Sequence, residues 1–147
     1  MNAVTVKFHR HAGNVVLPDY ATSSAAGMDI AAHVNEEVTL TPFARAAITT
    51  GFSMELPHGY EAQIRPRSGL ALRHGVTVAN APGTIDSDYR GEVAVILINL
   101  SQQDFTITSG MRIAQMVIVP VTKCHLEDVS HLDLSDRGTG GFGSTGL

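Results

Sequence analysis

The chain has 147 residues, of which 44% are hydrophobic and 16% are charged, and its formal net charge is −4. This length suits one domain with a real core and is short for two, and the hydrophobic content excludes wholesale disorder. A nucleic-acid-binding protein usually has a basic excess or a basic stripe, so we expect no nucleic-acid partner. An anionic small ligand stays compatible, because local arginines and backbone N–H groups can outweigh a mildly acidic total.

Cysteine content and hydropathy bear on the compartment. Cys124 is the only cysteine, so the chain has no internal disulfide, which fits a reducing cytosol. No apolar run reaches the roughly 18 residues of a membrane span, and residues 1–10 lack the apolar segment of a secretory signal. We therefore expect a cytoplasmic protein with no membrane partner.

The dominant pattern along the chain is an alternation of apolar and polar residues with a period of two. Short alternating segments occur at 4–8, 37–40 and 61–65. Two later runs, 94–100 and 112–119, are almost continuously apolar and rich in Val and Ile, which is typical of strands buried on both faces. Turn-forming Gly, Pro, Asn and Asp residues separate these segments. The pattern predicts an all-β fold such as a sandwich, barrel or jelly roll.

One short helix is predicted between the strands, at 68–74. Ser68 is a candidate N-cap, and Gly75 follows the helix as a suitable C′ residue. The first turn of a helix has unpaired N–H groups, and Arg67 stands just before them. The segment is therefore a candidate anion site, although helix capping alone also explains the serine.

A glycine-bracketed turn carries two carboxylates and an aromatic ring. The run GTIDSDYRGE, 83–92, contains Asp86, Asp88 and Tyr89 and leads directly into an apolar strand. Acids on a rigid turn can hold a polar ligand and activate a water molecule. The plainer alternative is that the aspartates cap the turn and the tyrosine packs against it.

Other polar residues have a structural and a functional explanation side by side. Asp29 follows Gly27 closely and suits a turn, and Gln115 inside an apolar strand can be satisfied by neighbouring backbone. His9 and His11 would share one face of a strand, either as a metal-binding pair or as a solvated edge. No third ligand with useful spacing supports the metal.

The composition changes after about Leu134. The segment RGTGGFGSTG, 137–146, is rich in glycine and carries Arg137, Phe142 and several hydroxyls. It suits either a floppy terminus or a flap that closes over a ligand, with backbone N–H groups meeting phosphates and the ring covering a flat base. We therefore divide the chain into a domain at 1–134 and a C-terminal flap at 135–147.

Five segments, in order, resemble the five motifs of the homotrimeric deoxyuridine triphosphatases (dUTPases). They are AGMDI (26–30), PRSGLA (66–71), NAPGTIDSDYRGE (80–92), GMRIAQ (110–115) and RGTGGFGSTG (137–146). Each motif alone is weak to moderate, but all five at compatible spacing are highly specific. Two small departures are Ile30, where Leu is common, and Ala94, where many members have a longer side chain.

The resemblance implies a distorted jelly-roll or β-clip subunit with one short helix, assembled as a homotrimer. It implies three active sites, each built from more than one chain. The implied reaction is hydrolysis of dUTP to dUMP and pyrophosphate by water attack at the α-phosphate, with Mg2+ on the triphosphate. This reaction keeps uracil out of DNA and supplies dUMP for thymidylate synthesis.

The resemblance also implies residue roles. Asp86 would act as general base, and Asp29 would act through waters of the magnesium shell. The phosphates would be contacted by Arg67, Ser68, the Gly69 N–H and Gln115. The uracil pocket would be a hairpin at 80–89 that includes Asn80, Gly83, Thr84 and Ile85, with Tyr89 under the deoxyribose so that a 2′-hydroxyl has no room. The tail would close over the nucleotide with Arg137, Phe142, Gly143, Ser144 and Thr145.

Two rival functions stay open at this point. One is a dCTP deaminase of the same superfamily, and the other is a deoxynucleotide-binding member that has lost catalysis. The complete fifth motif and the run DYRG after Asp86 favour the triphosphatase over the deaminase. The intact Asp86 argues against the silent member.

Overall fold

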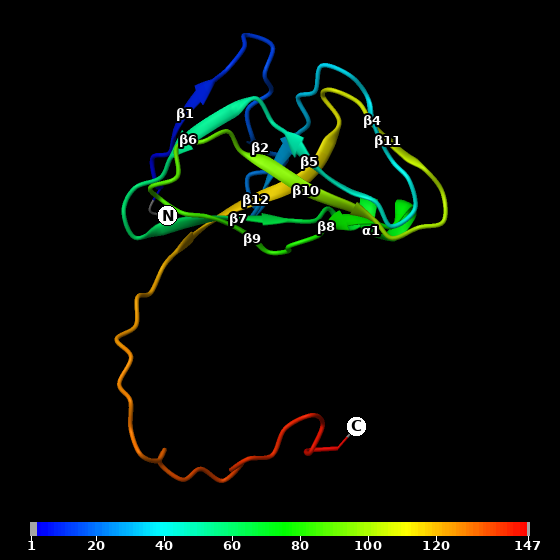
Figure 1. Ribbon diagram of the computed structural model, residues 1–147. Helices are drawn as coiled ribbons and strands as arrows, with labels where there is room; N and C mark the ends of the chain where they lie inside the picture. The colour runs from blue at the N-terminus through cyan, green and yellow to red at the C-terminus, as the bar shows by residue number, and fades with distance from the viewer. Residues whose placement is uncertain (1–2, 147) are drawn as a thin grey trace.

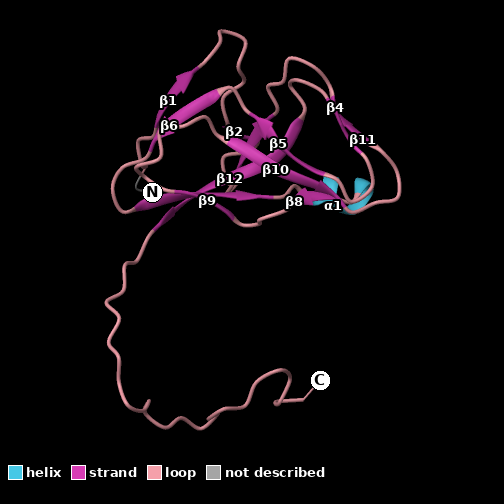
Figure 2. Ribbon diagram, viewed as in Figure 1, coloured by secondary structure: helices cyan, strands magenta, loops and turns pink. Residues whose placement is uncertain are grey.

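The computed structural model describes residues 3–146, and it is built from strands with one short helix (Figures 1 and 2). Residues 1–2 and 147, which belong to the two predicted domain ranges, lie outside the described residues. The elements in chain order are β1 (Lys7–Arg10), β2 (Asp19–Tyr20), β3 (Met28–Ala31), β4 (Val38–Leu40), β5 (Arg45–Thr49), β6 (Phe52–Glu55), β7 (Tyr60–Arg65), α1 (Ser68–His74), β8 (Val76–Val78), β9 (Gly83–Ile85), β10 (Ala94–Asn99), β11 (Phe105–Ile107) and β12 (Arg112–Pro120).

The strands form antiparallel sheets in which most neighbours are far apart in the sequence. The main sheet has the order β2-β3-β12-β7-β9, and a second sheet has the order β5-β10-β8. Two small pairs, β1-β6 and β11-β4, complete the arrangement. These crossing antiparallel connections make a distorted jelly roll. The all-β prediction is therefore confirmed.

Alternate residues of the two larger sheets fill the core between them. Ile64 and Met116 point inward from the main sheet, and Val95 and Leu97 point inward from the second sheet, all at most 3% exposed. The prediction that 94–100 is buried on both faces is wrong within one chain, because Ile96 is 37% exposed. The strand alternates like a half-buried strand, but with apolar residues on its open face.

The predicted helix is present with its predicted bounds, but its N-cap differs. Arg67 is the N-cap residue, with φ −90° and ψ 127°, and Ser68 is already the first helical residue. No side chain caps the helix, so Ser68 is not the cap that the sequence suggested. The C-terminus follows expectation, since Gly75 adopts φ 64°, a left-handed conformation that glycine tolerates.

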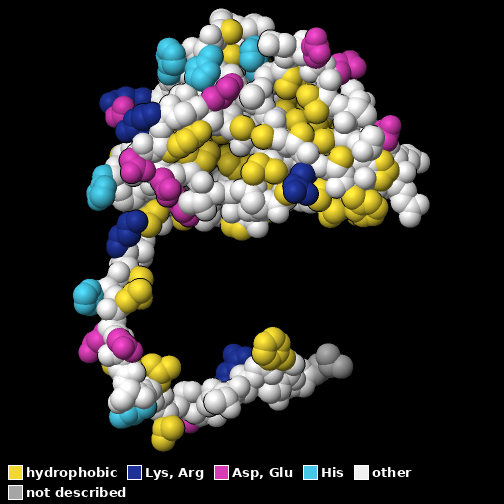
Figure 3. Space-filling model, in the orientation of Figure 1, with side chains coloured by type: hydrophobic (Ala, Val, Ile, Leu, Met, Phe, Trp, Pro, Cys, Tyr) yellow, Lys and Arg dark blue, Asp and Glu magenta, His cyan; other side chains and the backbone are white. Residues whose placement is uncertain are grey.

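The chain leaves the body of the domain after β12. The last backbone hydrogen bond to the body joins the Val121 N–H to the Gly59 carbonyl at 2.8 Å. Residues 122–146 then run outward as an extended arm, orange to red in Figure 1, whose apolar side chains stand in the open in Figure 3. None of the helices among residues 3–146 is long and apolar enough to cross a membrane.

Candidate active site

Residues from three of the sequence motifs meet on the outer face of the main sheet. Asp29 on β3 lies directly opposite Gln115 on β12, and Gln115 lies opposite Arg65 on β7. Just beyond Arg65 the chain turns into α1, and Arg67 points back so that its Nε lies 3.2 Å from Asp29 Oδ1. We call Asp29, Arg67, Gln115 and the neighbouring Arg112 the Asp29 cluster.

Arg112 joins this cluster because β12 contains a bulge. The register shifts between Arg112 and Ala114, so that Ile113 and Ala114 are both buried. The extra residue puts Arg112 and Gln115 on the same outer face, although they are three positions apart. Arg112 Nη1 then donates to Asp29 Oδ2 at 3.0 Å. Strict alternation would place these two residues on opposite faces, which is why the sequence did not assign Arg112 to the site.

The Gln115 side chain is held in one orientation by two neighbours. Its Nε2 donates to the Pro66 carbonyl at 3.0 Å. Its Oε1 lies where a Cβ on residue 27 would have to sit, so Gly27 leaves the space that the amide occupies. The glycine of the first motif and the glutamine of the fourth are therefore sterically matched. Neighbouring backbone, which the sequence offered as a partner for Gln115, accepts a hydrogen bond from only one of its two polar side-chain atoms.

The start of α1 lies beside this cluster. Ser68 and Gly69 are exposed, and a Cβ on Gly69 would have nothing within 4 Å. The first-turn N–H groups of a helix have no partner within the helix. The Ser68 hydroxyl is not used as a cap, so it is available to a ligand together with these groups.

Asp86 lies on a turn that is braced by its own residues. The Tyr89 N–H donates to the Asp86 carbonyl at 3.2 Å, and Arg90 Nη1 donates to the Ser87 carbonyl at 2.7 Å. The Tyr89 hydroxyl donates to the Glu92 carbonyl at 3.0 Å. The Asp86 carboxyl is exposed and lines a pocket of about 490 Å³. We call residues 86–89 the Asp86 turn.

Within the hairpin predicted at 80–89 the structure has one strand, β9, which pairs with β7 and not with another strand of the same segment. Strand β8 pairs with β10 in the second sheet, whereas β9 pairs with β7 at the edge of the main sheet. The segment between them leads from the second sheet to the main sheet. It does border a narrow pocket of about 60 Å³, which is lined by Asn80, Gly83, Thr84 and Ile85 with residues of β7, β8 and β10.

The Asp86 turn and the Asp29 cluster lie at opposite ends of the main sheet. Ile85 is level with Ala62 on β7, so Asp86 comes level with Glu61, whereas Gln115 is level with Arg65. Four residues of strand separate these two levels, which is about 13 Å at the rise of a β-strand. One chain therefore does not bring Asp86 to the Asp29 cluster.

The predicted tail residues also lie apart from both groups. Arg137 Nε donates to the carbonyl of Gly140 at 2.7 Å, and Phe142 is fully exposed. Beyond Lys123, the hydrogen bonds of the described arm are local to the arm. Gly143, Ser144 and Thr145 are likewise exposed in the arm.

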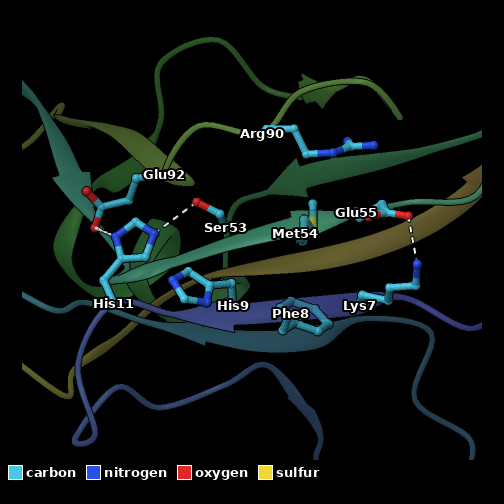
Figure 4. Close-up of a pocket in the computed structure, with 9 residues that line it drawn as sticks. All are labelled: Lys7, Phe8, His9, His11, Ser53, Met54, Glu55, Arg90 and Glu92. Carbon is cyan, nitrogen blue, oxygen red and sulfur yellow. Dashed lines mark hydrogen bonds and ion pairs between the residues drawn. The ribbon is translucent and has the colours of Figure 1, made fainter.

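A further pocket, of about 540 Å³, lies between β1, β6 and the loop at 90–92 and contains the two histidines (Figure 4). The rings of His9 and His11 are 5.6 Å apart, and His11 Nε2 lies 2.9 Å from Ser53 Oγ. No group of three metal-ligating side chains occurs among residues 3–146. At the other end of the pocket, a hydrogen bond and the charge of Lys7 lower the pKa of Glu55.

Comparison with known proteins gives relatives over nearly the whole chain. Residues 13–146 match the dUTPase family. The chain is 55% identical to the deoxyuridine 5′-triphosphate nucleotidohydrolase of Caulobacter vibrioides, over 98% of this chain and 96% of that protein. It is 60% identical to the enzyme of the same name from Roseobacter denitrificans, over 90% of this chain and 88% of that one.

Solved structures agree with the sequence relatives. The dUTPase of Staphylococcus bacteriophage 80alpha, solved with dUPNHPP, superposes with a TM-score of 0.87 at 27% identity. The match covers 97% of this chain and 99% of that chain. The ordered motifs, the jelly roll and these relatives lead to one conclusion, that the chain belongs to the dUTPase family.

Proposed function

We propose that the chain hydrolyses dUTP to dUMP and pyrophosphate by attack of water at the α-phosphorus. The observation that supports this most is the convergence of Asp29, Arg67 and Gln115 from three separate motifs in a member of the dUTPase family. The reaction keeps uracil out of DNA and supplies dUMP for thymidylate synthesis. The single exposed Cys124 suits the reducing cytosol, where we place the reaction.

Phosphoryl chemistry of this kind depends on positioning and charge more than on covalent participation of the protein. In our proposal, Arg67 and the groups at the start of α1 grip phosphate oxygens, with Ser68 and the Gly69 N–H as donors. Gln115 contacts the phosphates or the attacking water, and its fixed amide suits that task. Asp86 orients and deprotonates the water, and its exposed carboxyl leaves room for one.

The donor set at Asp29 fits a magnesium ion that is held mainly by substrate. Mg2+ keeps several waters and commonly uses one or two carboxylates with substrate phosphates, so it needs no all-protein cage. Each Asp29 oxygen faces one guanidinium and keeps a second lone pair for a metal-bound water. A bound magnesium ion would neutralise charge on the phosphate oxygens.

The narrow pocket beside β9 suits a uracil base. Within the described chain, β9 is an edge strand of its sheet, so one side of its backbone lacks a strand partner. The N–H and C=O groups near Asn80, Thr84 and Ile85 would pair with the edge of the base, and Gly83 lets the backbone approach closely. Cytosine presents the wrong donors and acceptors, and the narrow space excludes the thymine methyl. Tyr89 follows the residues of this pocket in the sequence, and it would pack under the deoxyribose.

The separation of the two groups supports a site shared between subunits of a homotrimer. A general base must lie within about 3 Å of the water that it activates. In one chain, Asp86 is about 13 Å along the sheet from the level of Gln115, by strand geometry. A second copy that presents its Asp29 cluster to the first copy's Asp86 turn closes this gap. The exposed apolar side of β10 is one surface that such an assembly can cover.

We also propose that residues 135–147 act as a flap on a site of another subunit. The extended arm reaches away from its own body, which suits this role (Figure 1). Arg137 would meet the γ-phosphate, and Phe142 would lie over the uracil. Gly143, Ser144 and Thr145 would close on the phosphates and exclude bulk water.

The test is pyrophosphate release from each deoxynucleoside triphosphate, with and without magnesium. We expect dUTP to be strongly preferred and Asp86→Asn to reduce turnover by about 100-fold or more while dUTP binding persists. Asp88→Asn, on the same turn, is the matched control and should keep most of the activity. Unchanged turnover in Asp86→Asn would rule out Asp86 as the base.

The same assay separates the rival functions. Release of ammonia from dCTP would indicate a deaminase in place of the triphosphatase. Tight dUTP binding without pyrophosphate release would indicate a protein that has lost catalysis.

A further inference from the structure

We infer that Arg112 is a positioning residue of the active site, which acts by keeping Arg67 available to the substrate phosphates. The inference rests on the proposed function, and it concerns a residue outside the set assigned above. Arg112 reaches the cluster only because of the bulge in β12. A bulge commonly re-aims a side chain next to an active site.

The contacts of Arg112 link it to both partners of the Asp29 cluster. Its Nη1 donates to Asp29 Oδ2 at 3.0 Å, while Arg67 Nε faces Asp29 Oδ1 at 3.2 Å. The Arg112 carbonyl also accepts a hydrogen bond from Arg67 Nη1 at 3.2 Å. Arg112 therefore holds the carboxylate with its side chain and the other guanidinium with its backbone.

Two carboxylates meet at this point of the sheet. Asp19 on β2 lies directly opposite Asp29 on β3, and Arg112 lines a pocket together with both. Like charges on directly opposed strand positions repel each other. Arg112 brings a positive charge to the pocket that these two acids line.

Loss of the Arg112 charge would change the interactions that Arg67 makes. Arg67 would become the only guanidinium on Asp29, with the charge of Asp19 close by. A guanidinium that must neutralise a carboxylate gives up hydrogen-bonding capacity for phosphate. Arg112 thus affects phosphate binding through Arg67, without a contact to the substrate.

The exposure of the side chains separates this role from one in folding. Within one chain, the Arg112 side chain is 59% exposed and that of Asp29 is 25% exposed. Ion pairs at exposed positions contribute little to stability. We therefore expect that a change at Arg112 weakens phosphate binding and leaves thermal stability almost unchanged.

The experiment compares Arg112→Gln, Arg112→Lys and Arg67→Gln, with the double variant of Arg67 and Arg112. Arg10→Gln, which changes an exposed arginine of β1 in the separate β1-β6 pair, is the matched control. The measurements are KM and kcat for dUTP, the melting temperature, and the affinities for dUMP and a non-hydrolysable imido analogue of dUTP.

We expect Arg112→Gln to weaken binding of the imido analogue and to raise the KM for dUTP, each by about tenfold, which is the scale of a charge-assisted contact. The loss should be smaller for dUMP, which has one phosphate, and smaller in Arg112→Lys, which keeps the charge. When Arg112→Gln is added to Arg67→Gln, the further loss of affinity for the imido analogue should be below about twofold, because the two residues act as one unit.

Three results would overturn the inference. An unchanged affinity in Arg112→Gln would exclude any role in binding. A full tenfold loss in the Arg67→Gln background would mean that Arg112 contacts phosphate directly, and a large fall in melting temperature would mean a role in folding. Failure of the proposed function is a separate outcome, since the unaltered protein would then release no pyrophosphate from dUTP.

Discussion

The substitution Gly27→Ala tests the steric match between the first and fourth motifs. Gly27 has a negative φ, so an added methyl causes no backbone strain there. The new Cβ would collide with Gln115 Oε1 and lie 3.3 Å from Gln115 Cδ. Because the colliding atom is at the far end of a flexible side chain, the glutamine can rotate away, and the fold can accommodate the change.

The cost in stability follows from the contact that the rotation breaks. Gln115 would lose its hydrogen bond to the Pro66 carbonyl, which is worth about 1 kcal/mol. This corresponds to a fall of about 3 °C in melting temperature for a domain of this size. Activity should fall far more, by about 100-fold, because a misplaced polar group at the reacting phosphates is costly.

The assay pairs thermal melts with kcat/KM for pyrophosphate release. Gly13→Ala is the matched control, because a Cβ at Gly13 would meet nothing within 4 Å. If Gly27→Ala keeps the activity of the control, the orientation of Gln115 does not matter and the steric argument is wrong. If Gly27→Ala fails to fold, rotation of the Gln115 side chain costs much more free energy than one hydrogen bond.

Three further predictions concern the core, the tail and the sugar. Asn99→Ala should cost about 3 kcal/mol in a denaturant melt, because its buried amide group makes four hydrogen bonds; Gln103→Ala is the control, since only its backbone is used. Truncation before Arg137 should leave the fold and assembly intact but lower kcat by about tenfold or more. A fully active truncated protein would exclude the flap. Tyr89→Ala should raise kcat/KM for UTP relative to dUTP, whereas Tyr89→Phe should not, and an unshifted ratio in Tyr89→Ala would exclude a sugar gate.

The fold could be predicted from alternation because most of the longer strands have one face on the core. The segment 61–65 shows this directly, since Ala62 and Ile64 are buried between polar neighbours. The continuous apolar run in β10 misled the prediction, because apolar residues also occupy the open face of the strand. A single sequence does not reveal whether such a face is covered by the same chain or by another copy.

The site could be predicted only in part, for two physical reasons. The strand partners around the hairpin predicted at 80–89 could not be read from the sequence, because they are set by contacts between distant segments, and β8 and β9 pair in different sheets. Arg112 was not among the predicted residues because of the bulge in β12. The bulge adds one residue to the strand, so Arg112 lies on the same face as Gln115 and not on the opposite face. Asp29, Arg67 and Gln115 could be grouped from the sequence because their motif spacing, unlike their contacts, is visible there, and the structure places them side by side.

Mixed assemblies can test the proposed division of the site between subunits. Asp86→Asn alone and Arg67→Gln alone should each be nearly inactive, because every site then lacks one of its two parts. If each site takes Asp86 from one subunit and Arg67 from another, a random equal mixture gives about one quarter of the sites both intact residues. The mixture, unfolded and refolded together to exchange subunits, should therefore recover about one quarter of the unaltered activity.

The control is the same mixture without refolding, in which the subunits keep their original partners. A single-chain site would give no recovery, because no subunit in the mixture has both residues intact. Recovery would also be absent if Asp86 reached the Asp29 cluster within its own chain. The strand register argues against that, since it holds Asp86 level with Glu61 and Gln115 level with Arg65, about 13 Å apart along one rigid sheet.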